Sequence, residues 1–165
     1  GGVLLSQIHD LDLLYALFGL PQKIFALGGK LTSLEVDVED TVSVLMNFLI
    51  DNRYIPVHIH QDYIQRPPAR NFELIGEKGK IIWDYYANRV DCYLCERTNP
   101  KLYSFDSFDR NQLFVDEIKH FMNCVAGKEL PVVSLQDGIN SLRMALAAKK
   151  SLECGRIVEM HEVAL

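Results

Sequence analysis

His9 is the side chain in this sequence best placed for acid/base chemistry. It lies in the first turn of an expected helix, with Asp10 beside it and Asp12 three residues further on. Residues three apart share one face of a helix, so the carboxylate of Asp12 can orient the imidazole. Histidine is also the side chain that most readily exchanges protons near neutral pH. We predict that His9 is a general acid or base supported by Asp12; a surface histidine near a helix cap is the alternative.

A second polar group follows one face of an expected strand. Side chains alternate between the two faces of a strand, so His58, His60 and Asp62 point the same way. Two imidazoles and a carboxylate at this spacing can hold a metal ion, but the sequence shows no further ligand to complete such a site. The alternative, which we favour, is a polar strand face that meets solvent, a ligand or a partner. His60 and Asp62 are therefore candidate substrate-binding residues, and no residue is assigned to a metal.

The third group lies where that strand ends. Arg66 and Arg70 flank the stiff pair Pro67-Pro68, and two guanidinium groups held in this way can bind a carboxylate or a phosphate bidentately. A solvated loop would contain the same residues. We predict that both arginines bind an anionic part of a substrate, with Arg66 contributing more because it adjoins the strand end.

The elements that must position these residues can be inferred from hydrophobic periodicity. The pattern predicts a helix, a run of five or six strands, two more helices and a last short strand. Ser6 is the expected N-cap of the first helix, which ends at Gly19. The later helices begin at Asp109 and Ser134 and end at Gly127 and Gly155. The expected strands cover residues 23–31, 41–50, 54–65, 71–75, 80–84, 89–96 and 156–160, with a hairpin turn at residues 76–79.

The order of these elements indicates the fold class. Consecutive strands joined by short turns pair antiparallel, and helices grouped in the sequence tend to cover one face. We therefore predict an α+β fold: an open-faced, mainly antiparallel sheet with helices on one face. No Gly-x-Gly-x-x-Gly turn joins a strand to a helix, so this chain is not expected to bind a dinucleotide by itself. Three helices leave the other face of the sheet uncovered, which predicts a partner there.

Composition narrows the class of protein further. The 165 residues suit one domain with a single core, and the net charge is −5, with 17 basic and 22 acidic residues. Without a basic stripe, nucleic acid is not an expected partner. No apolar run reaches the roughly 18 to 20 residues that span a bilayer, so no membrane is expected either. Four cysteines are too sparse for a disulfide framework and fit reduced thiols in a cytoplasmic protein.

Several motifs in combination resemble one enzyme family. The stretch GGVLLSQIHDLD at residues 1–12, followed by LFG at 17–19 and VEDT at 38–41, resembles the C-terminal domain of the glucose–fructose oxidoreductase/inositol dehydrogenase (Gfo/Idh/MocA) family. Residues 62–70, 75–81, 109–112 and 134–137 fit the same family. The resemblance covers essentially the whole chain, and it is specific through the combination of motifs.

The resemblance implies an NAD(P)-dependent oxidoreductase that transfers hydride to or from a sugar, nucleotide-sugar or polyol carbon. It makes residues 1–165 a single substrate-binding and oligomerisation domain, like the C-terminal domain of glyceraldehyde-3-phosphate dehydrogenase-type oxidoreductases. Family members bind NAD or NADP with an N-terminal Rossmann domain, and a chain that opens at Gly1 without methionine fits one that lacks that half. The fragment alone is then expected to be inactive. The family histidine matches His9, and the acid of its His-x-x-Asp pattern matches Asp12.

One departure from the family pattern leaves a second hypothesis open. Many members have an aspartate four residues before the histidine, where this chain has Leu5. A non-catalytic sugar-binding or oligomerisation module that keeps the fold is therefore the alternative. In either case the resemblance implies a homodimer or tetramer that forms through the open face of the sheet.

Overall fold

The structure, a computed structural model, describes residues 1–163 and divides into two compact units. The first unit combines residues 1–64 with the chain from Val132 onward, and the second runs from Gln65 to Pro131. Each unit contains one four-stranded antiparallel sheet. The α+β class and the antiparallel pairing expected from the sequence are confirmed. The strands are divided between two sheets, however, instead of continuing as one run.

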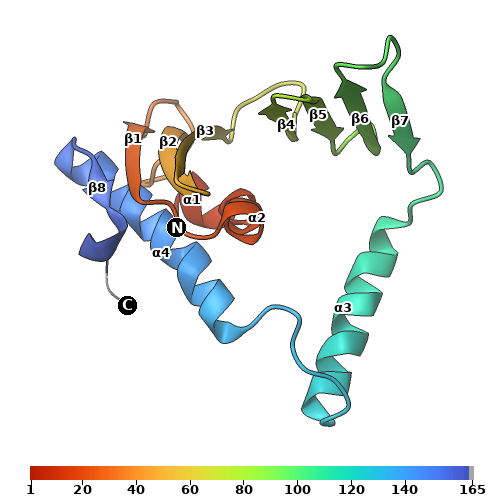
Figure 1. Cartoon of the computed structure of the whole chain (residues 1–165). Helices are drawn as coiled ribbons and strands as arrows, with labels where there is room; N and C mark the ends of the chain where they lie inside the picture. The colour runs from red at the N-terminus through yellow and green to blue at the C-terminus, as the bar shows by residue number, and fades with distance from the viewer. Residues whose placement is uncertain (164–165) are drawn as a thin grey trace. The chain divides into compact units, whose positions relative to one another are not determined.

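The sheet of the first unit has the order β3-β2-β1-β8 (Figure 1). Its strands are β1 (Lys23–Gly29), β2 (Thr41–Ile50), β3 (Arg53–Asp62) and β8 (Val158–Glu159). Side chains alternate along β2: Val42, Val44 and Phe48 are buried, whereas Leu45 is 54% exposed. One face of this sheet therefore carries the hydrophobic core, and the other is open.

Helices cover the buried face of the first sheet. They are α1 (Val3–Ser6), α2 (His9–Phe18) and α4 (Leu135–Cys154), and a short 3₁₀ helix, η1 (Met160–Glu162), follows β8. α4 lies against β1, where Met144 and Ala148 join the strand side chains in the core. Ser134 and Asp137 form a reciprocal capping box, and Gly155 ends α4 in the left-handed conformation, as expected. Within residues 1–163, no helix is both long and apolar enough to cross a membrane.

The first expected helix is divided in two. α1 ends at Ser6, and α2 begins at His9 with Ile8 as its N-cap and no side chain bonded to the cap. The prediction that Ser6 caps this helix is wrong, because the Ser6 hydroxyl instead accepts a hydrogen bond from the Tyr63 hydroxyl at 2.7 Å. Gly19 does end the helix, with a φ of 75°.

The second unit is a sheet of the order β4-β5-β6-β7 followed by one helix. Its elements are β4 (Asn71–Gly76), β5 (Gly79–Asp84), β6 (Arg89–Leu94), β7 (Lys101–Ser104) and α3 (Arg110–Val125). The expected hairpin is confirmed, since Gly76 pairs with Gly79. A Cβ atom at Gly79 would lie 1.9 Å from the backbone oxygen of Tyr93, so this close approach requires glycine. Asp109 caps α3 as expected and accepts a hydrogen bond from the Asn111 amide.

Asp40 anchors the loop between β1 and β2. Its buried carboxylate accepts hydrogen bonds from the backbone amides of Leu31 (2.9 Å) and Thr32 (3.0 Å) and from the Thr32 hydroxyl (2.6 Å). Burial by itself would raise the pKa of Asp40, but the bonds from Thr32 and Leu31 outweigh it and hold the pKa well below its usual range. The ionised carboxylate therefore stabilises the folded loop.

We expect Asp40→Asn to lower the Tm at neutral pH, because the amide carries no charge and has one acceptor oxygen. A pKa lowered by folding gives stability that is complete above the ordinary value of 3.8 and is lost as the pH falls toward the lowered value. The difference in Tm between wild type and variant should therefore shrink below pH 3.8. Thermal unfolding at a series of pH values measures it, with Asp37→Asn, an exposed carboxylate of the same loop, as the control. A difference that is constant down to about pH 3 contradicts this account.

Candidate functional site

The segment that precedes His9 is bonded to the end of β3. The Gln61 side chain, which is 2% exposed, donates to the backbone oxygen of Gln7 at 2.7 Å and to Asp10 Oδ2 at 3.0 Å. Gln7 in turn donates to the backbone oxygen of Asp62 at 3.1 Å. These bonds fix the start of α2, where His9 is exposed. His9 is therefore accessible to a ligand while its backbone is held in place, which suits proton transfer to a bound molecule.

Asp12 lies on α2 as expected but has a different partner. Its Oδ1 accepts a hydrogen bond from the Ser141 hydroxyl of α4 at 2.6 Å. Among the described residues, no hydrogen bond or salt bridge joins His9 to Asp12. A parallel contact lies beside it, where Asn140 donates to the Tyr15 hydroxyl at 2.9 Å. Asp12 thus binds α2 to α4 and supports the helix that carries His9, without orienting the imidazole.

His60 and Asp62 are brought together on the open face of the first sheet. His60 Nε2 lies 3.2 Å from Asp62 Oδ2, and its Nδ1 lies 3.0 Å from the Ser43 hydroxyl on β2. The imidazole is 47% exposed, so it can still contact a ligand. Over residues 1–163, no three histidine, cysteine or acidic side chains are grouped so that they could hold a metal ion. No hydrogen bond within that range joins His60 to His9.

Arg66 and Arg70 lie in the second unit and have different surroundings. Arg66 is exposed, and its Nη1 donates to the backbone oxygen of Gln65 at 2.8 Å. Arg70 stacks on aromatic rings: its Cζ lies 6.0 Å from the centre of the Trp83 ring and 5.3 Å from that of Tyr85. Arg66 is therefore bonded to its own loop, whereas Arg70 is part of a cluster of aromatic side chains.

Sequence reasoning missed two residues of these sites, Arg110 and Gln61. Arg110 Cζ lies 4.5 Å from the centre of the Tyr85 ring, and its position 40 residues after Arg70 gave no local signal. Gln61 did have a signal, because it follows Ile55, Val57 and Ile59 on the apolar face of β3. A polar side chain that continues a buried face must find buried hydrogen-bond partners.

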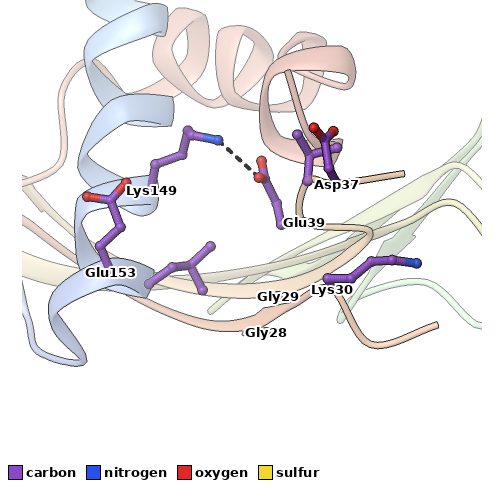
Figure 2. Close-up of a pocket in the computed structure, with 9 residues that line it drawn as sticks. Gly28, Gly29, Lys30, Asp37, Glu39, Lys149 and Glu153 are labelled. Carbon is purple, nitrogen blue, oxygen red and sulfur yellow. Dashed lines mark hydrogen bonds and ion pairs between the residues drawn. The ribbon is translucent and has the colours of Figure 1, made fainter. Parts of the chain in front are cut away.

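A pocket opens between α4 and the loop that follows β1 (Figure 2). Lys149 reaches from α4 toward Glu39, and the two side chains form an ion pair at 3.0 Å. The Glu39 carboxyl group also packs on Gly2, where a Cβ atom would lie 2.0 Å from Glu39 Cδ. The lining residues include Gly28, Gly29, Lys30, Asp37 and Glu153, and none of the predicted site residues is among them. We therefore interpret the Glu39–Lys149 pair as a support for the loop.

Fold and site together define an open-faced α+β domain that presents a supported histidine from its helical layer. The described residues contain no glycine-rich turn from a strand into a helix, which is the usual site for a dinucleotide. Residues 1–160 match the family model described as the oxidoreductase family C-terminal alpha/beta domain. The chain belongs to this family, the Gfo/Idh/MocA oxidoreductases.

Relatives of known structure or activity agree with this assignment. The chain is 34% identical to a myo-inositol 2-dehydrogenase from Thermotoga maritima, over 99% of the chain and 50% of the relative. The WlbA dehydrogenase from Bordetella pertussis, in complex with NADH and UDP-GlcNAcA, has a TM-score of 0.75 at 20% identity, over 100% of this chain and 49% of that one. A myo-inositol 2-dehydrogenase from Lactobacillus plantarum has a TM-score of 0.70 at 24% identity, over 96% and 48%. The chain thus spans about half the length of these relatives.

Proposed function

We propose that this chain is the substrate-facing part of an NAD(P)-dependent oxidoreductase that transfers hydride to or from a carbon of a sugar, nucleotide-sugar or polyol. The observation that carries the proposal is the 34% identity, across 99% of the chain, with a myo-inositol 2-dehydrogenase. The likeness to a dehydrogenase in complex with NADH and a nucleotide-sugar supports the same reaction class. NAD or NADP is the proposed cofactor of the whole protein.

Among the described residues, no glycine-rich turn leads from a strand into a helix. β1 leads through Gly28 and Gly29 into a loop and then into β2, so these glycines do not begin a helix whose amides could bind a pyrophosphate. We propose that a separate N-terminal Rossmann domain, the first partner of this domain, holds the dinucleotide. The nicotinamide supplies or accepts the hydride when bound, and the residues of this chain act on the substrate.

Each predicted residue has a role in this proposal. His9 gives or takes the proton of the substrate hydroxyl, since it is exposed at a fixed helix start. Asp12 supports His9 indirectly, because its hydrogen bond with Ser141 holds α2 against α4. In the first unit, His60 and Asp62 are the proposed contacts for hydroxyl groups of a substrate. For Arg66 and Arg70 of the second unit, binding of an anionic group stays a prediction from the sequence.

A second candidate function rests on Leu5. This side chain is partly buried and packs against the core, so no carboxylate stands four residues before His9. A proton relay through that position is absent, and a binding or oligomerisation module without catalysis would retain the same fold. Turnover by the intact protein separates the two functions.

We also propose that the domain assembles as a dimer or tetramer through the open face of the first sheet. Leu27, Leu45 and Leu49 on that face are 60%, 54% and 44% exposed, and Tyr54 beside Leu49 is 64% exposed. Clustered apolar side chains on a sheet face are typical of an interaction surface. A two-fold pairing is the simplest closed arrangement, because each copy presents the same surface.

The proposal that this chain binds the substrate and a separate Rossmann domain binds the cofactor can be tested directly. We expect the 165-residue chain alone to bind neither NAD nor NADP in a calorimetric titration, and to show no dehydrogenase activity. The intact protein should reduce NAD⁺ or NADP⁺ with at least one member of a panel of sugars, nucleotide-sugars and inositols. Saturable micromolar binding of either cofactor to the chain alone contradicts the proposed division, and an intact protein that binds cofactor but is inactive on every alcohol favours the non-catalytic module.

A further inference from the structure

The side chain of Gln61 forms hydrogen bonds on both sides of His9. Its Nε2 donates to the backbone oxygen of Gln7 at 2.7 Å and to Asp10 Oδ2 at 3.0 Å. Gln7 precedes His9 by two residues, and Asp10 follows it directly. The same stretch is bonded to β3 a second time, because the Gln7 side chain donates to the backbone oxygen of Asp62 at 3.1 Å. The position of His9 therefore depends on the end of β3.

The amide group of Gln61 is buried, and its orientation is fixed. Gln61 lies opposite Val42 in the sheet and is 2% exposed. Both partners of its Nε2 are acceptors, so the amide satisfies them only with its NH₂ group toward α2. Its Oε1 is buried and, among the described residues, has no hydrogen-bond partner. An unpaired buried oxygen is unfavourable for folding, so packing of the core does not by itself explain an amide here.

The start of α2 depends on this amide because it has no side-chain cap. Ile8 is the N-cap, and no side chain among the described residues bonds to it in that role. The backbone oxygen of Gln7 accepts the Asp10 amide at 3.3 Å as well as the Gln61 side chain. A helix start without a cap frays more easily. Gln61 thus replaces, from a neighbouring strand, the support that a cap would give.

We infer that Gln61 is a positioning residue for proton transfer: its two hydrogen bonds hold the turn that carries His9, and with it the imidazole, at the substrate hydroxyl. Gln61 is too buried to contact a substrate itself. The inference rests on the proposed function and deepens it, since it assigns part of the rate provided by His9 to a residue of β3. An acid or base that is displaced by about 1 Å can lose about 100-fold in rate.

Gln61→Met tests the role of the two bonds. Methionine keeps the length of the side chain and removes both donors together with the unpaired oxygen. We expect the kcat of the intact enzyme to fall by about 10- to 100-fold, with the KM for substrate within about threefold of wild type. Asn140→Leu is the matched control, because Asn140 is also a buried amide that bonds to α2, at the Tyr15 hydroxyl and away from His9. Its kcat should stay within about threefold of wild type.

Gln61→Glu adds a readout in pH. This substitution keeps the shape but places a carboxylate oxygen against Asp10 Oδ2, where wild type has a donor. At neutral pH, kcat should fall at least as far as in Gln61→Met. The neighbouring carboxylate favours protonation of the new carboxyl group as the pH falls, and the protonated group can again donate one hydrogen bond. The kcat of Gln61→Glu relative to wild type should therefore rise toward acidic pH, whereas that of Gln61→Met should stay constant.

The combination with His9→Ala shows whether Gln61 acts through the imidazole. If it does, adding Gln61→Met to His9→Ala lowers kcat little further. Each kcat is taken per cofactor-binding site counted by titration, so that unfolded protein is not read as slow enzyme. An active wild type with an equally active Gln61→Met, or a full additional loss in the double variant, overturns the inference and leaves the proposed function standing. An intact protein that turns over no alcohol overturns the proposed function, and this inference with it.

Discussion

Replacing His9 with alanine is expected to lower the kcat of the intact enzyme by about 100- to 10,000-fold, the usual contribution of a general acid or base. His9 is exposed at the start of α2, and the bonds from Gln61 to Gln7 and Asp10 hold that start in place without using the imidazole. The substitution should therefore remove the proton-transfer group and leave the fold intact. The affinity for NAD(P) should hardly change, because the cofactor is proposed to bind another domain.

Steady-state kinetics and cofactor titration on the same preparations measure both effects. His161→Ala is the control, since His161 is an exposed histidine on η1 that has no proposed role in proton transfer or assembly. Its kcat should stay close to that of wild type. A His9→Ala enzyme within about threefold of wild type would show that the proton comes from another group.

Local spacing predicted where His9 and Asp12 lie, but not the partners of their helix. Hydrophobic periodicity predicted a helix that contains both residues, and both do lie on α2. Local spacing could not reveal that the hydroxyl of Ser141, 129 residues later, donates to the Asp12 carboxylate. Nor could it reveal that the side chain of Gln61 donates to the backbone oxygen of Gln7, which lies 54 residues earlier and just before α2. Contacts between distant segments depend on how helices and strands pack, and periodicity describes only the element in which a residue lies.

The same limit applies to the fold. Alternation along β2 and the glycines of the β4–β5 hairpin are local signals, and both predicted the observed strands. Strand β7 gave no such signal, because its four residues, Lys101–Ser104, are all exposed and do not alternate. The division into two sheets could not be predicted from local sequence signals either. It depends on β3 pairing only with β2, and on the chain leaving the first unit after Ile64, just before the Pro67-Pro68 pair.

Replacing Leu45 with lysine is expected to convert the assembled protein into monomers or aggregates. Leu45 lies in the middle of β2 and opposite Phe25 and His58 on the open face, so a charge there would be buried in a face-to-face pairing. A stable interface buries about 1,200 Å² or more, and an unpaired buried charge costs several kcal/mol in such a setting. The net charge of −5 opposes association only weakly, since salt screens it over about 8 Å at physiological ionic strength.

Leu17→Lys provides the comparison for this experiment. Leu17 is also a half-exposed leucine of the first unit, but it lies on α2, in the helical layer instead of on the open face. We expect light scattering coupled to size-exclusion chromatography to find the wild type and Leu17→Lys as dimers or tetramers, and Leu45→Lys as a monomer or an aggregate. Because the open face belongs to this domain alone, the 165-residue chain should already associate without the cofactor domain. If the unmodified chain is a well-behaved monomer at high micromolar concentration, the exposed leucines of the sheet do not form the interface, and assembly must use the other half of the protein.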